Sequence, residues 1–169
     1  TPLGQGFIND TFIIHTEGEA PNYILQRKNK AIFPDVPAMM DNIDRVTAHI
    51  RKKVAAEGGD IHREVMTINH THDGKFYFVD ESGEYWAVCE FIADTIAYDS
   101  ANSEALARMG GMGIGKFQSQ LADFTEPLAE VIKGFHNIKH RFVQWDEAIA
   151  QDAAGRVASL SKEIEWIES

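Results

Sequence analysis

The order of strand-type and helix-type segments is the feature that most limits how this chain can fold. Strand-type runs occupy the chain up to Ile92, apart from one long helical pattern, and only helical patterns follow from Ser100 onward. Strands and helices segregated in this way are typical of α+β proteins with an antiparallel sheet, whereas alternating strands and helices build parallel sheets. We therefore expect an α+β fold and exclude a doubly wound dinucleotide-binding fold.

The predicted strands are short runs of β-branched, aromatic and other apolar residues. Asp73-Gly74 is a strong hairpin signal between two of them. The last strand is continuously apolar until Glu90, as expected of a central strand. The predicted strands span residues 12–15, 23–27, 61–69, 76–79 and 85–92.

A long amphipathic helix is predicted between the second and third strands. Pro34-Asp35-Val36-Pro37 begins it, Gly58-Gly59 ends it, and apolar residues recur between them at three- and four-residue intervals. Asn42 or Asp44 could face a strand cation, although a solvated flank is the favoured interpretation. The apolar positions are Met39 or Met40, Ile43, Val46, Ile50 and Val54.

The helical patterns beyond Ser100 are less regular. Glycines at 110, 111, 113 and 115 interrupt the first of them. Because a glycine inside a helix costs about 1 kcal/mol relative to alanine, so many of them predict close packing against another element or a local break. We expect a short helix from Glu126-Pro127 to about Lys133, a loop at 134–137, and further helices over 142–152 and 153–169.

The composition excludes several classes of protein. The chain has 169 residues, 44% of them hydrophobic, and a formal net charge of -10. This charge argues against a broad basic surface for nucleic acid. A single cysteine, Cys89, leaves no disulfide framework. Because no apolar run reaches membrane-spanning length and no signal peptide is visible, we predict a cytoplasmic protein.

Both ends of the sequence resemble internal positions of a longer chain. The first residue is Thr1 and not an initiator Met, and the last helical pattern continues to Ile167. We therefore expect a piece of a longer protein.

The stretch from Gly4 to Phe12 is the main candidate for ligand binding. Gly4 and Gly6 carry no Cβ and can adopt positive φ, so the backbone can approach a ligand closely. Short polar side chains follow the turn, and a glycine-rich hairpin of this kind can cover nucleotide phosphates. An ordinary β-hairpin is the alternative interpretation. The polar side chains are those of Asn9, Asp10 and Thr11.

Two further clusters are candidates for binding. Gln26, Arg27 and Lys28 end a predicted strand and are possible phosphate ligands. Because side chains alternate across a strand, Gln26 and Arg27 cannot face the same pocket. Arg27 is preferred on charge, and a surface arginine is an equally good interpretation. His70, His72 and Asp73 lie in a turn without further ligands nearby, so no metal site is predicted.

Several segments together resemble the aminoglycoside phosphotransferase and choline kinase superfamily, the protein-kinase-like small-molecule kinases. The similarity covers nearly the whole chain and is greatest to the branch that contains N-acetylhexosamine 1-kinase. The strings that carry it are Gly4-Gln5-Gly6-Phe7-Ile8-Asn9-Asp10-Thr11-Phe12, Tyr23-Ile24-Leu25-Gln26-Arg27-Lys28-Asn29, Phe33-Pro34, Asn42-Ile43-Asp44-Arg45-Val46-Thr47, Phe135-His136-Asn137 and Arg141-Phe142.

The resemblance implies an ATP site. Residues 1–92 would form the nucleotide-binding lobe, and 93–169 a linker and the first helices of the substrate lobe. The turn from Gly4 to Thr11, with Gln5 and Phe7, would cover the phosphates, and Gln26 or Arg27 would occupy the position of the phosphate-binding lysine. The hinge that meets adenine would consist of Glu90, Phe91 and Ile92.

The resemblance also implies a reaction that this stretch of chain cannot perform. Phosphoryl transfer needs a carboxylate near the acceptor hydroxyl and Asp or Asn ligands for Mg²⁺. The family supplies them from His-x-Asp-x-x-x-x-Asn and a later Asp, and the His-x-Asp motif is absent from this sequence. We expect these catalytic residues to lie beyond Ser169. The 169 residues alone are therefore expected to be inactive. The implied acceptor is the anomeric hydroxyl of an N-acetylhexosamine. The alternatives are choline or an aminoglycoside as acceptor, or a non-catalytic scaffold.

Overall fold

The computed structural model describes residues 1–4 and 8–169 and has the expected α+β fold. The chain divides into two compact units, Thr1–Val131 and Ile132–Ser169, which are described separately. The first unit contains the sheet. Its strands are β1 (Asp10–Ile14), β2 (Tyr23–Lys28), β3 (Ile68–Asn69), β4 (Phe78–Val79) and β5 (Tyr85–Glu90).

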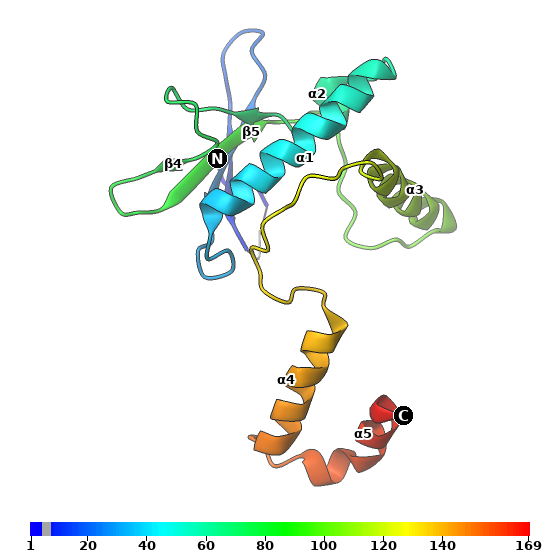
Figure 1. Cartoon of the computed structure of the whole chain (residues 1–169). Helices are drawn as coiled ribbons and strands as arrows, with labels where there is room; N and C mark the ends of the chain where they lie inside the picture. The colour runs from blue at the N-terminus through cyan, green and yellow to red at the C-terminus, as the bar shows by residue number, and fades with distance from the viewer. Residues whose placement is uncertain (5–7) are drawn as a thin grey trace. The chain divides into compact units, whose positions relative to one another are not determined.

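All strand pairs of the sheet are antiparallel, in the order β1-β2-β5-β3, and β4 pairs with another part of β5. The prediction of a central last strand is confirmed, because β5 contacts β2, β3 and β4 (Figure 1). Residues 1–3 extend the sheet beside β1: Pro2 bridges to Phe12, and the Leu3 amide donates to the Thr11 carbonyl at 2.8 Å.

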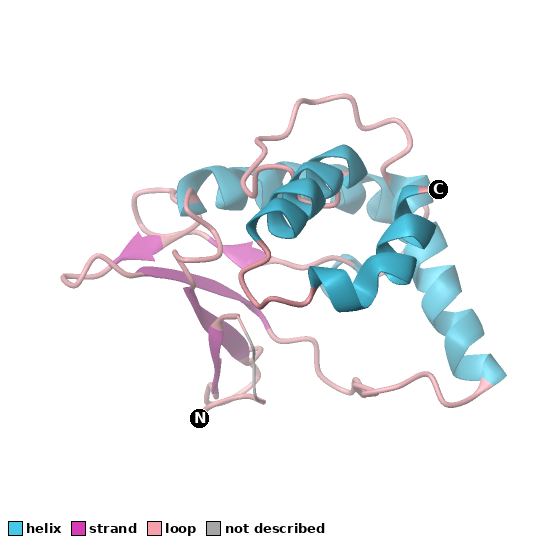
Figure 2. Cartoon of the chain, turned by 90° about the horizontal axis from the view of Figure 1, so that it is seen from below, coloured by secondary structure: helices cyan, strands magenta, loops and turns pink. Residues whose placement is uncertain are grey.

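Helix α1 (Val36–Ala56) covers one face of the sheet, as Figures 1 and 2 show. Its start follows from capping, because the Asp35 side chain accepts from the Ala38 amide at 2.9 Å and Pro37 lies in the first turn. Gly58 adopts a φ of 74° just after the helix, which explains why a glycine ends it. The predicted helix is therefore confirmed.

The apolar stripe of α1 forms two core clusters. In the first, Val36 and Met40 pack with Ala87 of β5. In the second, Ile50 and Val54 pack with Val65, which follows α2 (Ile61–Glu64). The largest fully buried side chains among the described residues, those of Met40, Val36 and Val54, all belong to this helix. Burial of α1 against β5 and α2 therefore holds the first unit together.

The predicted strand over 61–69 is wrong for its first half. Residues 61–64 form the short helix α2, and only Ile68–Asn69 pairs as β3. Asp60 caps α2 by accepting from the His62 amide at 2.9 Å. Ile61 packs against the second core cluster, to which Val65 belongs. A helix brings these two residues to one face without Arg63, whereas a strand would place the charged Arg63 on that face between them.

The predicted helix over 127–133 is also wrong. The segment is irregular because side chains of α1 bind its backbone. Asn42 Nδ2 donates to the Ala129 carbonyl, and Asn42 Oδ1 accepts from the Ala129 amide, both at 2.9 Å. Arg45 Nη1 donates to the Pro127 carbonyl at 2.8 Å. The favoured interpretation of Asn42 as a solvated flank is therefore wrong as well.

The glycine-rich pattern forms one helix, α3 (Glu104–Gln120), without a break. Ser103 caps it by accepting from the Leu106 amide at 3.2 Å. A Cβ added at any of its four glycines would meet no described atom within 4 Å other than its chain neighbours and the adjacent backbone of α3 itself. The prediction that these glycines mark a break or a close contact is therefore wrong.

The first compact unit extends beyond Ile92 because the segment after α3 packs on α1. Leu121 contacts the second core cluster, and His49 Nε2 lies 3.1 Å from Asp123 Oδ1. Lys53 also forms an ion pair with Asp123. The boundary between the two compact units therefore lies after Val131. The resemblance instead implies a boundary after Ile92, between a nucleotide-binding lobe and a substrate lobe.

The second unit contains α4 (Ile138–Gln151), the 3-10 turn η1 (Val157–Leu160) and α5 (Ser161–Glu168). Asn137 caps α4 by accepting from the His140 amide at 3.3 Å, so the loop predicted over 134–137 is confirmed. Across the described parts of both units, every helix is too short or too polar to cross a lipid bilayer.

Candidate functional site

The strands after the glycine turn divide the candidate residues between two faces of the sheet. The register pairs Thr11 with Gln26 and Gln26 with Ala87, so these three share one face. Ala87 packs against α1, and we call this side the inner face. Asp10 pairs with Arg27 in the register, and both lie on the opposite side, the outer face.

Lys28 is the most unusual residue of the inner face. It is only 8% exposed, and it lines a small cavity beneath α1 together with Gln26 and Met40. Lysine is almost never buried to this extent without a partner of opposite charge. No carboxylate of the described residues lies within ion-pair distance of Lys28. A buried lysine with no acidic partner is a candidate for binding an anion.

A chain of hydrogen bonds holds the Lys28 ammonium in place. Lys28 Nζ donates to Gln26 Oε1 at 2.7 Å, and Gln26 Nε2 donates to Thr11 Oγ1 at 3.2 Å. Burial lowers the pKa of Lys28, and the nearby Cys89 thiol opposes that shift. A bound anion would stabilise the ammonium, because the present contacts leave two of its three donor positions unused by described residues.

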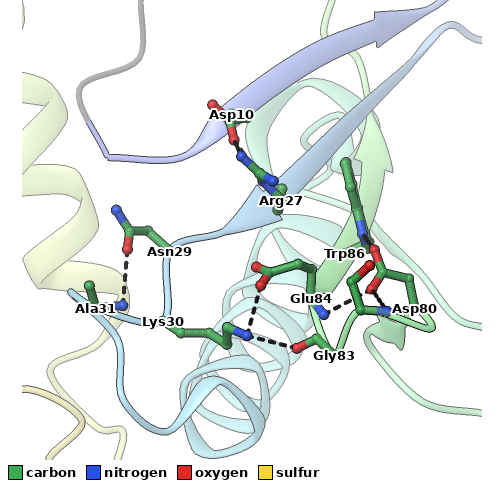
Figure 3. A network of polar contacts seen from close by, with 10 residues as sticks. Asp10, Arg27, Asn29, Lys30, Ala31, Asp80, Gly83, Glu84 and Trp86 are labelled. Atoms are coloured by element: carbon green, nitrogen blue, oxygen red, sulfur yellow. Dashed lines mark hydrogen bonds and ion pairs between the residues drawn. The ribbon is translucent and has the colours of Figure 1, made fainter.

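Arg27 lies on the outer face and is already neutralised. Its Nε donates to Asp10 Oδ2 at 2.7 Å, and the two side chains are 47% and 53% exposed (Figure 3). An exposed pair of this kind contributes little to stability. Of the two candidates named from the sequence, it is Gln26 and not Arg27 that shares a face with Lys28.

The glycine turn is described only at its ends. Gly4 adopts a φ of 66°, a conformation that favours glycine. The candidates Gln5, Gly6 and Phe7 lie outside the described residues. On the far side of the turn, Asn9 Oδ1 accepts from the Asn29 amide at 3.1 Å.

Asn29 fastens the turn to the end of β2. Its Nδ2 donates to the Ile8 carbonyl at 3.1 Å, and its Oδ1 accepts from the Ala31 amide at 3.0 Å (Figure 3). The Asn29 side chain, directly after Lys28, thus links Ile8 to Ala31. The sequence showed this asparagine in a family-like string but gave no reason to assign it a role.

Replacing Asn29 with alanine is expected to loosen this link. Two side-chain hydrogen bonds are lost, each worth about 1 kcal/mol, so the Ala31 amide should exchange its hydrogen faster. Hydrogen exchange followed by mass spectrometry measures the change. Asn102→Ala, in the exposed loop before α3, should leave exchange near residue 31 unchanged. Equal protection of the Ala31 amide in Asn29→Ala and in the unsubstituted chain would contradict the assignment.

The three hinge candidates follow the end of β5. The Glu90 amide donates to Thr67 O at 2.9 Å, and the Phe91 amide donates to Asn22 O at 2.8 Å. The Ile92 amide has no hydrogen-bond partner among the described residues, and its carbonyl accepts from Thr95 Oγ1 at 3.3 Å. Ile92 is therefore the candidate with a backbone donor available for a ligand.

Two side chains of α2 hold this segment, and the sequence did not reveal them. His62 Nδ1 lies 3.0 Å from Glu90 Oε2, and Arg63 Nη1 donates to the Ala93 carbonyl at 3.2 Å. Both residues were assigned to a strand, so no contact with the hinge could be expected. The available signal was Arg63, which a strand would place on the same face as the apolar Ile61 and Val65.

The turn with His70, His72 and Asp73 has a structural role. Two hydrogen bonds to the Asp73 carboxylate lower its pKa to about 2. The one from Lys75 has the larger effect, and the one from the Thr71 hydroxyl has the smaller. His70 Nε2 is 3.9 Å from Asp44 Oδ1. The described residues contain no group of three His, Cys, Asp or Glu side chains that could hold a metal ion. This turn therefore offers no cluster of three side chains for a metal ion.

No family model matches this chain. The site must therefore be interpreted from its own residues.

Proposed function

We propose that this chain is the ATP-binding portion of a small-molecule kinase related to the aminoglycoside phosphotransferases. The observation that carries the proposal is Lys28, a buried cation without an acidic partner on the strand next to the one that follows the glycine turn. Kinases place a phosphate-binding lysine on a strand beneath a glycine-rich loop. Lys28 thus replaces Arg27 in the role that the sequence had suggested.

The order of the elements supports the same proposal. A glycine turn leads into β1, β2 carries the lysine, α1 follows, and β3, β4 and β5 complete the sheet. This is the order implied by the resemblance to protein-kinase-like small-molecule kinases. The α+β fold with an antiparallel sheet is compatible with such a lobe.

The inner face offers complementary groups for the parts of ATP. Lys28 would bind a phosphate, because its ammonium is held by Gln26 and has donors to spare. The backbone amide of Ile92 would donate to the adenine ring, as hinge residues of kinases do. Thr11 and Asn9 lie at the return of the turn that would cover the phosphates.

This portion should bind ATP without transferring its phosphate. No His-x-Asp-x-x-x-x-Asn motif occurs in the sequence, and the described residues contain no group of three His, Cys, Asp or Glu side chains that could hold a metal ion. The acceptor of the whole kinase would be a sugar hydroxyl, with the anomeric hydroxyl of an N-acetylhexosamine as the first choice. A non-catalytic, kinase-like scaffold is the second candidate, and the missing motif is the observation that favours it.

Calorimetric titration tests the proposal. We expect ATP to bind and AMP to bind at least about tenfold more weakly, because a charge-assisted phosphate contact is worth about 1.5–3 kcal/mol. Incubation with ATP, Mg²⁺ and N-acetylglucosamine should yield no sugar phosphate. Equal affinity for AMP and ATP would contradict phosphate binding by Lys28, and sugar phosphate formation would contradict the predicted inactivity.

A further inference from the structure

The outer face of the sheet carries a pocket that the proposed nucleotide site does not use. Its volume of about 560 Å³ lies within the range of small-molecule sites, roughly 300–1,000 Å³. Strands β1, β2 and β5 contribute aliphatic side chains, and the segment from 76 to 86 contributes aromatic rings. The lining residues that matter here are Ile14, Leu25, Val88, Phe76, Phe78 and Trp86.

The aromatic wall of this pocket is held by polar contacts. Trp86 Nε1 donates to Asp80 Oδ2 at 2.7 Å, and Asp80 Oδ1 accepts from the Ser82 and Glu84 amides at 2.9 Å (Figure 3). Phe76 packs edge-on against His70 with ring centroids 4.8 Å apart. The indole and phenyl rings are thus fixed before a ligand arrives, which reduces the entropy lost on binding.

The lining contains two side chains with acceptor oxygens, Asn69 and Asp80, beside the hydroxyl groups of Tyr23, Thr71 and Tyr77. Asn69 Oδ1 is buried and has no hydrogen-bond partner among the described residues. A buried acceptor of this kind normally has a donor, so it calls for one from a ligand. Asp80 brings a negative charge to the same lining, which contains no lysine or arginine in the described part of the chain.

We propose that this pocket binds small organic cations that carry an aromatic ring, the arylalkylamines. The apolar lining would bury the ring of such a ligand, and the Trp86 and Phe76 faces would attract the ammonium by cation–π interaction. The ammonium would also supply the donor that Asn69 Oδ1 lacks. Neither Lys28 nor Gln26 lines this pocket, although Ala87 and Val88 of β5 border both it and the cavity beneath α1.

Two ligands with the same ring and opposite charge test this proposal. Tryptamine and indole-3-propionate are titrated separately while the indole N–H signal of Trp86 is followed by NMR. We expect tryptamine to shift this signal and to bind about tenfold more tightly than the carboxylate. Equal affinities, tighter binding of the carboxylate, or no shift with either ligand would overturn the proposal.

Three variants locate the binding. Ile14→Trp places a bulky ring in the pocket from an edge strand at a position that is 39% exposed, and it should abolish tryptamine binding. Asn69→Leu removes the orphan acceptor and should weaken tryptamine binding severalfold. Ile114→Trp makes the same exchange on α3, at a position that is 64% exposed, and should have no effect.

The controls separate this site from the nucleotide site and from misfolding. Circular dichroism should show that all three variants are folded, and ATP binding should be unchanged in Ile14→Trp. Tryptamine binding that survives Ile14→Trp would overturn the proposal even if ATP binds as expected. If the unsubstituted chain binds tryptamine but not ATP, the proposed ATP site is wrong and the proposed amine site still holds.

Discussion

Replacing Lys28 with methionine is expected to weaken ATP binding roughly ten- to hundredfold. The substitution keeps an unbranched chain in the cavity beneath α1 and removes only the charge that would bind phosphate. Loss of a charge-assisted hydrogen bond costs about 1.5–3 kcal/mol, which is the basis of this range. Isothermal titration calorimetry measures the affinity. The free energy of unfolding should change little, because exchanging a buried charge for an apolar side chain is often neutral.

Arg27→Met is the matched control for Lys28→Met. The two residues are adjacent, carry the same charge and lie on opposite faces of β2. Arg27→Met should change ATP affinity less than about twofold, because an exposed ion pair is screened by water. If Arg27→Met weakened ATP binding more than Lys28→Met, the phosphate would lie on the outer face and the proposed site would be wrong.

The pH dependence of ATP binding gives a second measurement on the same lysine. Burial lowers the pKa of Lys28, so its ammonium is lost at a lower pH than that of an exposed lysine. ATP affinity should therefore fall as pH rises through this lowered pKa. The affinity of Lys28→Met should lack that fall. A structural role of Lys28 alone would not produce such a difference.

The parts of the fold that depend on local signals could be predicted from the sequence. The apolar spacing from Met40 to Val54, the cap at Asp35 and the glycines after the helix all favour α1, and the structure agrees with each of them. The apolar run before Glu90 indicated the central strand. These signals lie within a few residues of the element that they determine.

The parts that depend on distant contacts could not be predicted. Residues 127–133 look helical, but two side chains of α1 bind this backbone instead: Asn42 at Ala129 and Arg45 at Pro127. The burial of Lys28 depends on which face of β2 meets α1. Alternation shows that Gln26 and Arg27 face opposite ways, but it does not show which of them faces the helix.

Met40→Ala is expected to destabilise the first unit by about 2–5 kcal/mol, the range for truncating a buried methionine. Met40 is 2% exposed and joins α1 to Ala87 of the central strand, so its loss leaves a cavity that the rigid sheet cannot fill. Urea denaturation followed by circular dichroism measures the change. Because Met40 also lines the cavity with Lys28 and Gln26, ATP binding should weaken in the same variant.

Met109→Ala is the matched control for Met40→Ala, since it makes the same exchange in another helix of the first unit. Met109 is 65% exposed on α3, so its truncation removes little buried area and should change the free energy of unfolding by less than about 0.5 kcal/mol. Similar losses of stability in the two variants would mean that Met109 is buried as deeply as Met40. The inner face would then not be the main core of this unit, and the anchoring of Lys28 against α1 would have to be reconsidered.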